Sequence, residues 1–232
     1  MSVSLPQGYR NVLNEALTSF LAEPDLWLMP LDHLHMTALE ITHSRTAEEI
    51  DKIVKGILPC IGSITDYTYQ HRASLIKPML SYDEAAVALS FVPAAEEAYN
   101  WDSTAHAGHH YTYHHLRRDL YSLCREAGTV VDSRYSVPSS HVTIGRFITA
   151  EDHACLDERT GSWVPDRENM ARWIDGIDRI NAWLRAEYWP DDRNTVPKPG
   201  SQWVVGEEQG LDCRYGTLWY GGGTTIRIGQ GF

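Results

Sequence analysis

Apolar residues recur every three or four positions in four parts of the chain, which is the period of an amphipathic helix. The first pattern ends before Pro24. The second opens with Thr46-Ala-Glu-Glu, the Thr-x-x-Glu form of a capping box, and stops at Pro59. The third is closed by Gly128, where a left-handed C-cap residue is expected. The predicted helices span residues 9–20, 46–57, 113–127 and 170–184.

Short apolar segments bounded by turn residues predict strands between and after these helices. The end of the chain is rich in them, and Gly-rich turns join its strands. Gly221-Gly222-Gly223 has the composition of a phosphate cradle, but no Gly-Lys-Ser/Thr and no helix follows it, so we interpret it as a hairpin turn. The predicted strands span residues 34–41, 73–79, 85–92, 140–148, 203–205, 211–220 and 224–228.

The order of strand then helix occurs twice, once after Leu34 and once after Ser140, which indicates a weak internal duplication. The chain has 232 residues, of which 43% are hydrophobic and 10% aromatic, so it can bury a sizeable core. This length suits one domain or two closely apposed lobes. We expect residues 1–232 to form a single domain with two lobes.

The formal net charge of −11 at pH 7 narrows the range of molecules that the protein is expected to bind. A protein that binds long nucleic acid through its phosphates needs a broad Lys/Arg surface, so that class is disfavoured, whereas a short anionic substrate in a local pocket is compatible. No apolar run could span a bilayer and the first residues lack a signal-peptide pattern, so we expect a cytoplasmic protein with no membrane partner.

The four cysteines are widely spaced and include no Cys-x-x-Cys pair. A chain of this size with so few cysteines does not have the pattern of a disulfide-stabilised fold. We expect reduced thiols that pack mostly as small apolar groups. The residues concerned are Cys60, Cys124, Cys155 and Cys213.

Two predicted strands each carry a His-x-Thr motif. Side chains at positions i and i+2 of a strand lie on one face, so His35 and Thr37 should point the same way, as should His141 and Thr143. A hydroxyl can hydrogen-bond a non-bridging phosphate oxygen, while the neighbouring imidazole gives or takes a proton. The pairs therefore suit acid/base chemistry on a phosphate.

A third His-x-Thr match, His110-Tyr-Thr112, lies in a polar stretch rather than in a strand pattern. About one match is expected by chance from the numbers of His and Thr in the chain, and we interpret this one as incidental. Either of His35 and His141 alone would be interpreted as a hydrogen-bonded core histidine. Together, with their threonines and their similar strand contexts, they favour a catalytic pair.

The polar stretch from Pro93 to Thr112 and the helix after it are rich in His and Tyr. The histidines lack the regular spacing with Cys or carboxylates that a metal site requires, so no metal is expected there. An alternative is a lid in which Tyr111 and Tyr113 cover the base or ring of a substrate. The histidines concerned are His106, His109, His110, His114 and His115.

The segments PLDHLHMTALEITHSRT and VPSSHVTIGRFIT resemble the two signature segments of the two-histidine (2H) phosphoesterases. They are most similar to the fungal proteins described as RNA ligase/cyclic nucleotide phosphodiesterase-like and, more distantly, to LigT-type RNA 2′,3′-cyclic phosphodiesterases. The motif histidines lie 106 residues apart (141 − 35), which suits one motif per lobe, and the C-terminal GLDCRYGTLWYGGGTTIRIG also looks like the fungal subgroup.

The resemblance implies an α+β, bilobal fold in which two antiparallel sheets, flanked by helices and related by a pseudo-twofold axis, face each other across a central cleft. It also implies His35 and His141 as the acid/base pair, Thr37 and Thr143 as phosphate ligands, and neither metal nor cofactor. Relatives of the LigT type carry a phosphate-approaching Arg five residues after the second His, where this chain has Arg146. Strict alternation puts Arg146 on the face opposite His141, so a bulge or a strand end would have to redirect it.

The leading hypothesis is therefore hydrolysis of a 2′,3′-cyclic phosphate on a nucleotide or a short RNA end. One neutral imidazole would take a proton from water, while the other, protonated, would donate to the departing ribose oxygen. Two alternatives remain open, because fold does not fix function. One is an acid/base enzyme of other chemistry, such as an isomerase or cyclase, and the other is a nucleotide-binding module without turnover.

Overall fold

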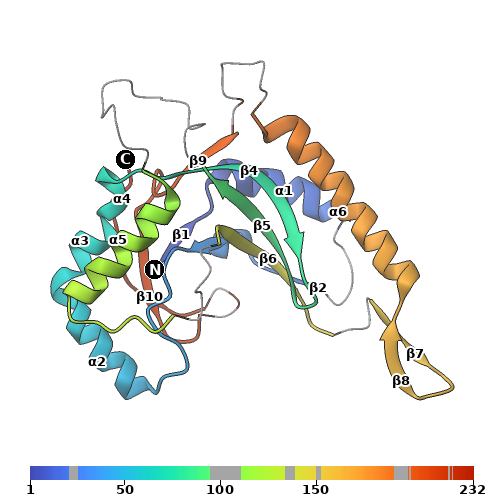
Figure 1. Ribbon diagram of the computed structural model, residues 1–232, viewed down its shortest axis with the longest axis horizontal. Coiled ribbons are helices and arrows are strands. Elements are labelled where there is room, and N and C mark those ends of the chain that lie inside the picture. Colours follow the sequence, from blue (N-terminus) through green and yellow to red (C-terminus); the bar gives the residue numbers. More distant parts are fainter. Residues whose placement is uncertain are drawn as a thin grey trace.

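The structure is a computed structural model that describes residues 1–20, 26–94, 111–133, 139–149, 153–190, 198, 200–218, 220 and 222–232. Figure 1 shows its helices and strands. The α-helices are α1 (Gln7–Phe20), α2 (Ala47–Ile57), α3 (Ile61–Thr65), α4 (Tyr67–Gln70), α5 (Tyr113–Glu126) and α6 (Arg167–Tyr188). The strands are β1 (Ser2–Ser4), β2 (Leu26–Leu28), β3 (His35–Thr37), β4 (Ser74–Tyr82), β5 (Ala86–Pro93), β6 (His141–Phe147), β7 (Ala154–Asp157), β8 (Ser162–Pro165), β9 (Gln202–Val204), β10 (Asp212–Tyr215) and β11 (Thr224–Ile228).

The four predicted helices are confirmed as α1, α2, α5 and α6. The capping box of α2 is formed as expected: Thr46 N–H donates to Glu49 Oε2 at 2.8 Å, and Glu49 N–H donates to Thr46 Oγ1 at 3.3 Å. Gly128 follows α5 with a φ of 76°, the left-handed conformation that glycine adopts without strain. Local capping chemistry therefore sets the start of α2 and the end of α5.

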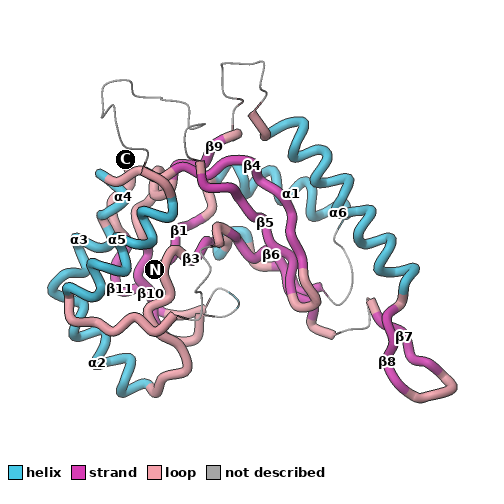
Figure 2. The backbone as a smooth tube through the Cα atoms, in the orientation of Figure 1, coloured by secondary structure: helices cyan, strands magenta, loops and turns pink. Residues whose placement is uncertain are grey.

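Nine of the described strands form one antiparallel sheet in the order β11-β10-β1-β3-β6-β5-β4-β9, with β2 also paired to β6. The sheet curls, with α3 beside β10 and β11 at one end and α6 along β4 at the other (Figure 2). The side-chain amide of Asn181 fixes α6 to β4, because it accepts from Leu80 N–H at 2.7 Å and donates to Leu80 O at 3.1 Å. The class of fold is α+β.

The described residues do not confirm the expectation of two separate sheets in two pseudo-symmetric lobes. The strands of the two His-x-Thr motifs, β3 and β6, pair with each other at Met36 and Val142, and this pairing joins the strands into one sheet. The second sheet among the described residues is small: β7 and β8 pair as a hairpin that projects from the body at the foot of α6 (Figure 1).

The two faces of the central strands differ in polarity. Val3, Met36, Val142 and Ile144 are at most 2% exposed and belong to the hydrophobic core. Side chains alternate across a strand, so the polar neighbours of these residues lie on the opposite, half-buried face. The central strands therefore bury one face in the core and leave a polar face for a site.

The predicted C-terminal hairpin is confirmed, since β10 and β11 pair in antiparallel fashion across the Gly-rich segment.

The cysteines are free thiols, with Cys124 and Cys213 buried and Cys155 exposed. In the part of the chain that the structure describes, no helix combines the length and the apolar character needed to cross a membrane.

Candidate functional site

Strands β3 and β6 bring the two His-x-Thr motifs together. Met36 and Val142 pair across the strands, and both side chains point into the core. The motif residues flank this pair in each strand, so all four side chains lie on the opposite face of the sheet. The motif residues are His35, Thr37, His141 and Thr143.

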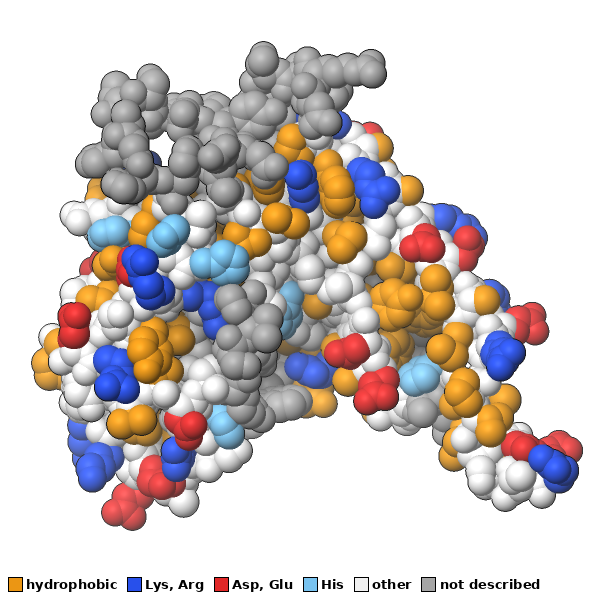
Figure 3. Space-filling view, viewed as in Figure 1, with side chains coloured by type: hydrophobic (Ala, Val, Ile, Leu, Met, Phe, Trp, Pro, Cys, Tyr) orange, Lys and Arg blue, Asp and Glu red, His pale blue; other side chains and the backbone are white. Residues whose placement is uncertain are grey.

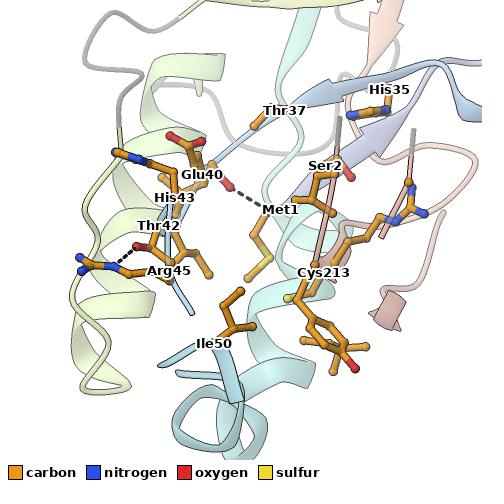
Figure 4. A pocket seen from close by; sticks show the side chains of 18 of the residues that line it. Met1, Ser2, His35, Thr37, Glu40, Thr42, His43, Arg45, Ile50 and Cys213 are labelled. Carbon is orange, nitrogen blue, oxygen red and sulfur yellow. Dashed lines mark hydrogen bonds between the residues drawn. The ribbon is translucent and has the colours of Figure 1, made fainter. Parts of the chain in front are cut away.

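The four motif side chains line a single cavity of about 340 Å³. This volume lies within the range of small-ligand sites in proteins. The face shown in Figure 3 is hollowed near its middle, where His and Lys or Arg side chains meet. In Figure 4, His35 and Thr37 lie along their strand at one end of the cavity, and Ile50 and Arg45 lie at the other.

Each imidazole is held at Nδ1 by the residue two positions earlier in the chain. His35 Nδ1 lies 2.7 Å from the backbone oxygen of His33. His141 Nδ1 lies 3.0 Å from Oγ of Ser139. Since a carbonyl oxygen only accepts, Nδ1 of His35 carries the hydrogen, and Nε2 is the nitrogen that exchanges a proton in the neutral ring.

The surroundings of both histidines favour the neutral imidazole. Burial lowers the pKa of His35 below its ordinary value; the His33 carbonyl opposes this shift, and the Arg214 guanidinium adds to it. Burial also lowers the pKa of His141, and the positive charges of Arg146 and Arg117 act in the same direction. A bound anion would reverse the effect, because its charge stabilises the imidazolium.

A β-bulge redirects Arg146 toward the cavity. Along β5, Val87 pairs with Gly145 but the next residue, Ala88, pairs with Thr143, so Ile144 is the extra residue of the bulge. Ile144 and Gly145 are both buried, and Arg146 returns to the face of Thr143 and lines the cavity. The bulge that the alternation pattern required for Arg146 to reach the site is therefore present.

Gly145, the residue after the bulged Ile144, lies in close contact with β2. A Cβ atom added at Gly145 would lie 3.0 Å from Trp27 O and 3.2 Å from side-chain carbons of Leu26 and Leu28. We expect Gly145→Val to lower the free energy of unfolding by about 1–3 kcal/mol through overpacking, measured by urea denaturation.

Gly56→Ala is the matched control, because a Cβ at Gly56 meets no atom within 4 Å. Gly56 lies inside α2, so the alanine should leave the stability unchanged or raise it by up to about 1 kcal/mol. Equal stability of Gly145→Val and the wild type would mean that β2 moves aside freely and that the contact at Gly145 is not tight.

The cavity also has residues to which the sequence assigned no role. Arg214 of β10 lines it, as do Tyr215 and Tyr220. An aliphatic wall comes from the apolar face of α2, including Ile50 and Ile53. The alternation of polar and apolar residues in Asp-Cys-Arg at the start of β10 is the signal that could have placed Arg214 on a polar sheet face.

Tyr111 and Tyr113 do not line this cavity. Tyr113 is fully buried, and its hydroxyl donates to the backbone oxygen of Thr37 at 3.3 Å, so it supports β3 from the core. The Tyr111 hydroxyl donates to Asp119 Oδ2 at 3.0 Å. The structure therefore does not place either tyrosine in the cavity, and Tyr113 contacts the motif residues only through the Thr37 backbone.

The polar stretch before α5 falls largely outside the described residues, including His106, His109 and His110. Thr112, the threonine of the third His-x-Thr match, is the N-cap residue of α5, with its backbone N–H and its Oγ1 at 3.1 and 2.9 Å from His115 Nδ1. It thus serves a helix terminus rather than a strand face. Within the described ranges, no group of three or more His, Cys, Asp or Glu side chains is arranged to hold a metal ion.

Fold and site together define an α+β protein with a curled antiparallel sheet whose polar face carries two histidine–threonine pairs in one cavity. No protein-family model and no curated protein matches the sequence. Among solved structures, TT0787 of Thermus thermophilus is similar with 18% sequence identity and a TM-score of 0.40, over 64% of this chain and 73% of that one. A similarity this distant carries no argument about function.

Proposed function

We propose that the protein is a metal-independent phosphodiesterase that hydrolyses the 2′,3′-cyclic phosphate of nucleotides or of short RNA ends. The observation that carries this proposal is the meeting of two His-x-Thr pairs, 106 residues apart in the chain (141 − 35), with Arg146 in one cavity. Two imidazoles supply one acid and one base, while two hydroxyls and a guanidinium suit phosphoryl oxygens.

In the proposed reaction, the neutral imidazole takes a proton from water as the water oxygen attacks phosphorus. The bond from phosphorus to one ribose oxygen breaks, and the protonated imidazole donates its proton to that oxygen. The Thr37 and Thr143 hydroxyls and Arg146 stabilise the negative charge that gathers on the phosphoryl oxygens. Each group that this mechanism needs is a side chain of β3 or β6.

The two ends of the cavity support a substrate that carries an organic part beside its phosphate. The motif residues form a polar end, whereas Ile50, Ile53 and Val54 of α2 contribute an aliphatic wall. A free phosphate ion would leave this wall without a partner, while an apolar group of the substrate gains free energy by leaving water there. A nucleoside supplies such a group through the faces of its base and sugar.

The deciding experiment incubates the pure protein with the four nucleoside 2′,3′-cyclic monophosphates and with short RNA that ends in a cyclic phosphate. We expect ring opening to a monoester, at the same rate with EDTA as without it, because the histidines perform the proton transfers that a metal-bound water would otherwise perform. Separation of products by chromatography measures the rate and identifies the monoester formed.

Each other result would contradict part of the proposal. Activity that EDTA abolishes and a divalent ion restores would replace the two-histidine mechanism by metal catalysis. Binding of the cyclic nucleotides without turnover would make the protein a nucleotide-binding module. Absence of both binding and turnover would direct the search to acid/base chemistry on another small substrate.

A further inference from the structure

The polar face of the sheet extends beyond the two motif strands to β1 and β10. In register, Ser2 of β1 pairs with Thr37 on one side and with Asp212 of β10 on the other. Thr37, Ser2 and Asp212 thus lie side by side across three neighbouring strands. Arg214 follows Asp212 by two positions, shares its face of β10 and lines the same cavity as the motif residues.

Arg214 is held in place from two directions. Its Nη2 donates to the backbone oxygen of Gly223 at 3.2 Å, and its Nε lies 3.7 Å from Asp212 Oδ2. Asp212 Oδ2 is fixed in turn by Thr225, whose hydroxyl donates to it at 3.2 Å. The side chains of Arg214 and Asp212 are only 22% and 18% exposed. A partly buried guanidinium with such supports has a defined position before any ligand arrives.

We propose that Arg214 is a second phosphate-binding residue, so that the phosphate lies between two arginines, Arg214 from the β10 side and Arg146 from β6. This inference rests on the proposed function for the identity of the substrate. The strand order supports it, because β10 and β1 lie on one side of β3 while β6, which carries Arg146, lies on the other. Asp212 is then a positioning residue for Arg214.

The charges that act on the two histidines also come from these two sides of the cavity. Arg214 is a neighbouring charge that lowers the pKa of His35, whereas Arg146 and Arg117 lower that of His141. The other charges that face His35 are Asp212 and the Met1 amino group, and Asp83 also acts on His141. Each motif therefore has its own arginine at the cavity.

Two arginines favour the charge of the product over that of the substrate. A cyclic phosphodiester carries one negative charge, whereas the pentacoordinate transition state and the monoester product carry about two at neutral pH. A second guanidinium at the phosphate should therefore stabilise the transition state more than the bound substrate, which raises kcat rather than lowering KM. It should also make the monoester product bind more tightly than the cyclic substrate.

The test compares Arg214→Gln and Arg146→Gln with Arg159→Gln, which removes an exposed arginine from the turn between β7 and β8. The probes are adenosine 2′- and 3′-monophosphate, with binding measured by calorimetry at pH 7.5. We expect each cavity variant to lose about tenfold or more in affinity for the monophosphate that the wild type binds better, as for loss of a charge-assisted hydrogen bond, and the Arg159 variant to lose none.

A second readout follows the ring protons of His35 and His141 by NMR as the pH is varied. Removal of a positive charge raises a neighbouring histidine's pKa. Arg214→Gln should therefore raise the pKa of His35 more than that of His141, and Arg146→Gln should do the reverse. A structural role in the β10–β11 turn would not produce this crossed pattern.

Unchanged monophosphate affinity in a folded Arg214→Gln protein would overturn the inference. If that variant fails to fold, Arg214→Lys decides: it keeps the charge, so the pKa of His35 should stay in place, while affinity falls because an ammonium lacks the planar fork of donors. Wild-type affinity in Arg214→Lys would also overturn it. If the variants lose monophosphate affinity as expected but the wild type turns over no cyclic phosphate, only the proposed function is contradicted. If the wild type turns over a cyclic phosphate and Arg214→Gln keeps the wild-type affinity for the monophosphate, only this inference is contradicted.

Discussion

Replacement of either His35 or His141 by alanine is expected to lower kcat/KM roughly 10²- to 10⁴-fold, the contribution of one general acid or base. The two residues act as a unit in the proposed reaction, so the double variant should be little worse than the poorer single variant. The measurement is the rate of cyclic-phosphate opening by each purified variant, with circular dichroism to establish that the fold is retained.

The dependence of kcat/KM on pH is a second test of the histidine pair. The proposed reaction needs one protonated and one neutral imidazole, and the pKa values of both histidines lie below the ordinary value of about 6.5 in the free protein. The profile of kcat/KM should therefore peak below about pH 6.5, falling at higher pH as the acid loses its proton and at lower pH as the base gains one. The two limbs belong to the pair, and each alanine variant should lose a different limb.

His110→Ala is the control, since His110 belongs to the third motif, whose threonine is the N-cap residue of α5. This variant should keep both the rate and the pH profile of the wild type. An inactive His110 variant, together with free replacement of either His35 or His141, would mean that the wrong motifs have been paired.

Thr37→Val and Thr143→Val are each expected to lower kcat on the order of 10²-fold, the loss that follows removal of one preorganised hydrogen-bond donor. Valine keeps the shape of threonine and is well accommodated in strands, so the fold should survive. The measurement is steady-state kinetics on a nucleoside 2′,3′-cyclic monophosphate.

Thr112→Val is the control for these variants, because Thr112 stands at the N-terminus of α5 and should affect stability rather than activity. Its loss should lower the free energy of unfolding by about 1 kcal/mol and leave kcat unchanged. If Thr37→Val and Thr143→Val both turn over like the wild type, the threonines serve only as strand formers and the phosphate binds elsewhere.

The part of the site that the sequence could predict is the part with a local pattern. Alternation in a strand places each histidine beside its threonine, and resemblance to a family pairs the two motifs. The direction of Arg146 required the bulge at Ile144, which the pairing with β5 defines; its only mark in the sequence of β6 is the neighbouring Gly145, which is ambiguous because a glycine inside a strand also fits a close backbone approach without a bulge. Arg214 reaches the cavity only because β10 pairs with β1, a contact between the two ends of the chain.

The same distinction holds for the fold. The four long helices show a helical period, and the sequence predicted them, whereas it did not predict the short helices α3 and α4 or the hairpin strands β7 and β8. Strands β1 and β2 are three residues long, too short to show an alternation, and the sequence predicted neither. The predicted strand 211–220 stops at Tyr215, because Gly216 takes a φ of 96° and leaves the extended conformation. Tyr113 was already part of the apolar pattern of its helix, which is consistent with its buried position.

The pairing of Met36 with Val142 makes assembly of the proposed catalytic site depend on contacts between distant parts of the chain. These partners are far apart in sequence, so their contact closes a long loop, and such non-local contacts form late and slowly. Neither half of the chain holds a usable fraction of the site, since each supplies only one imidazole. Recovery of activity during refolding would therefore report completion of the native topology, after helix formation is over.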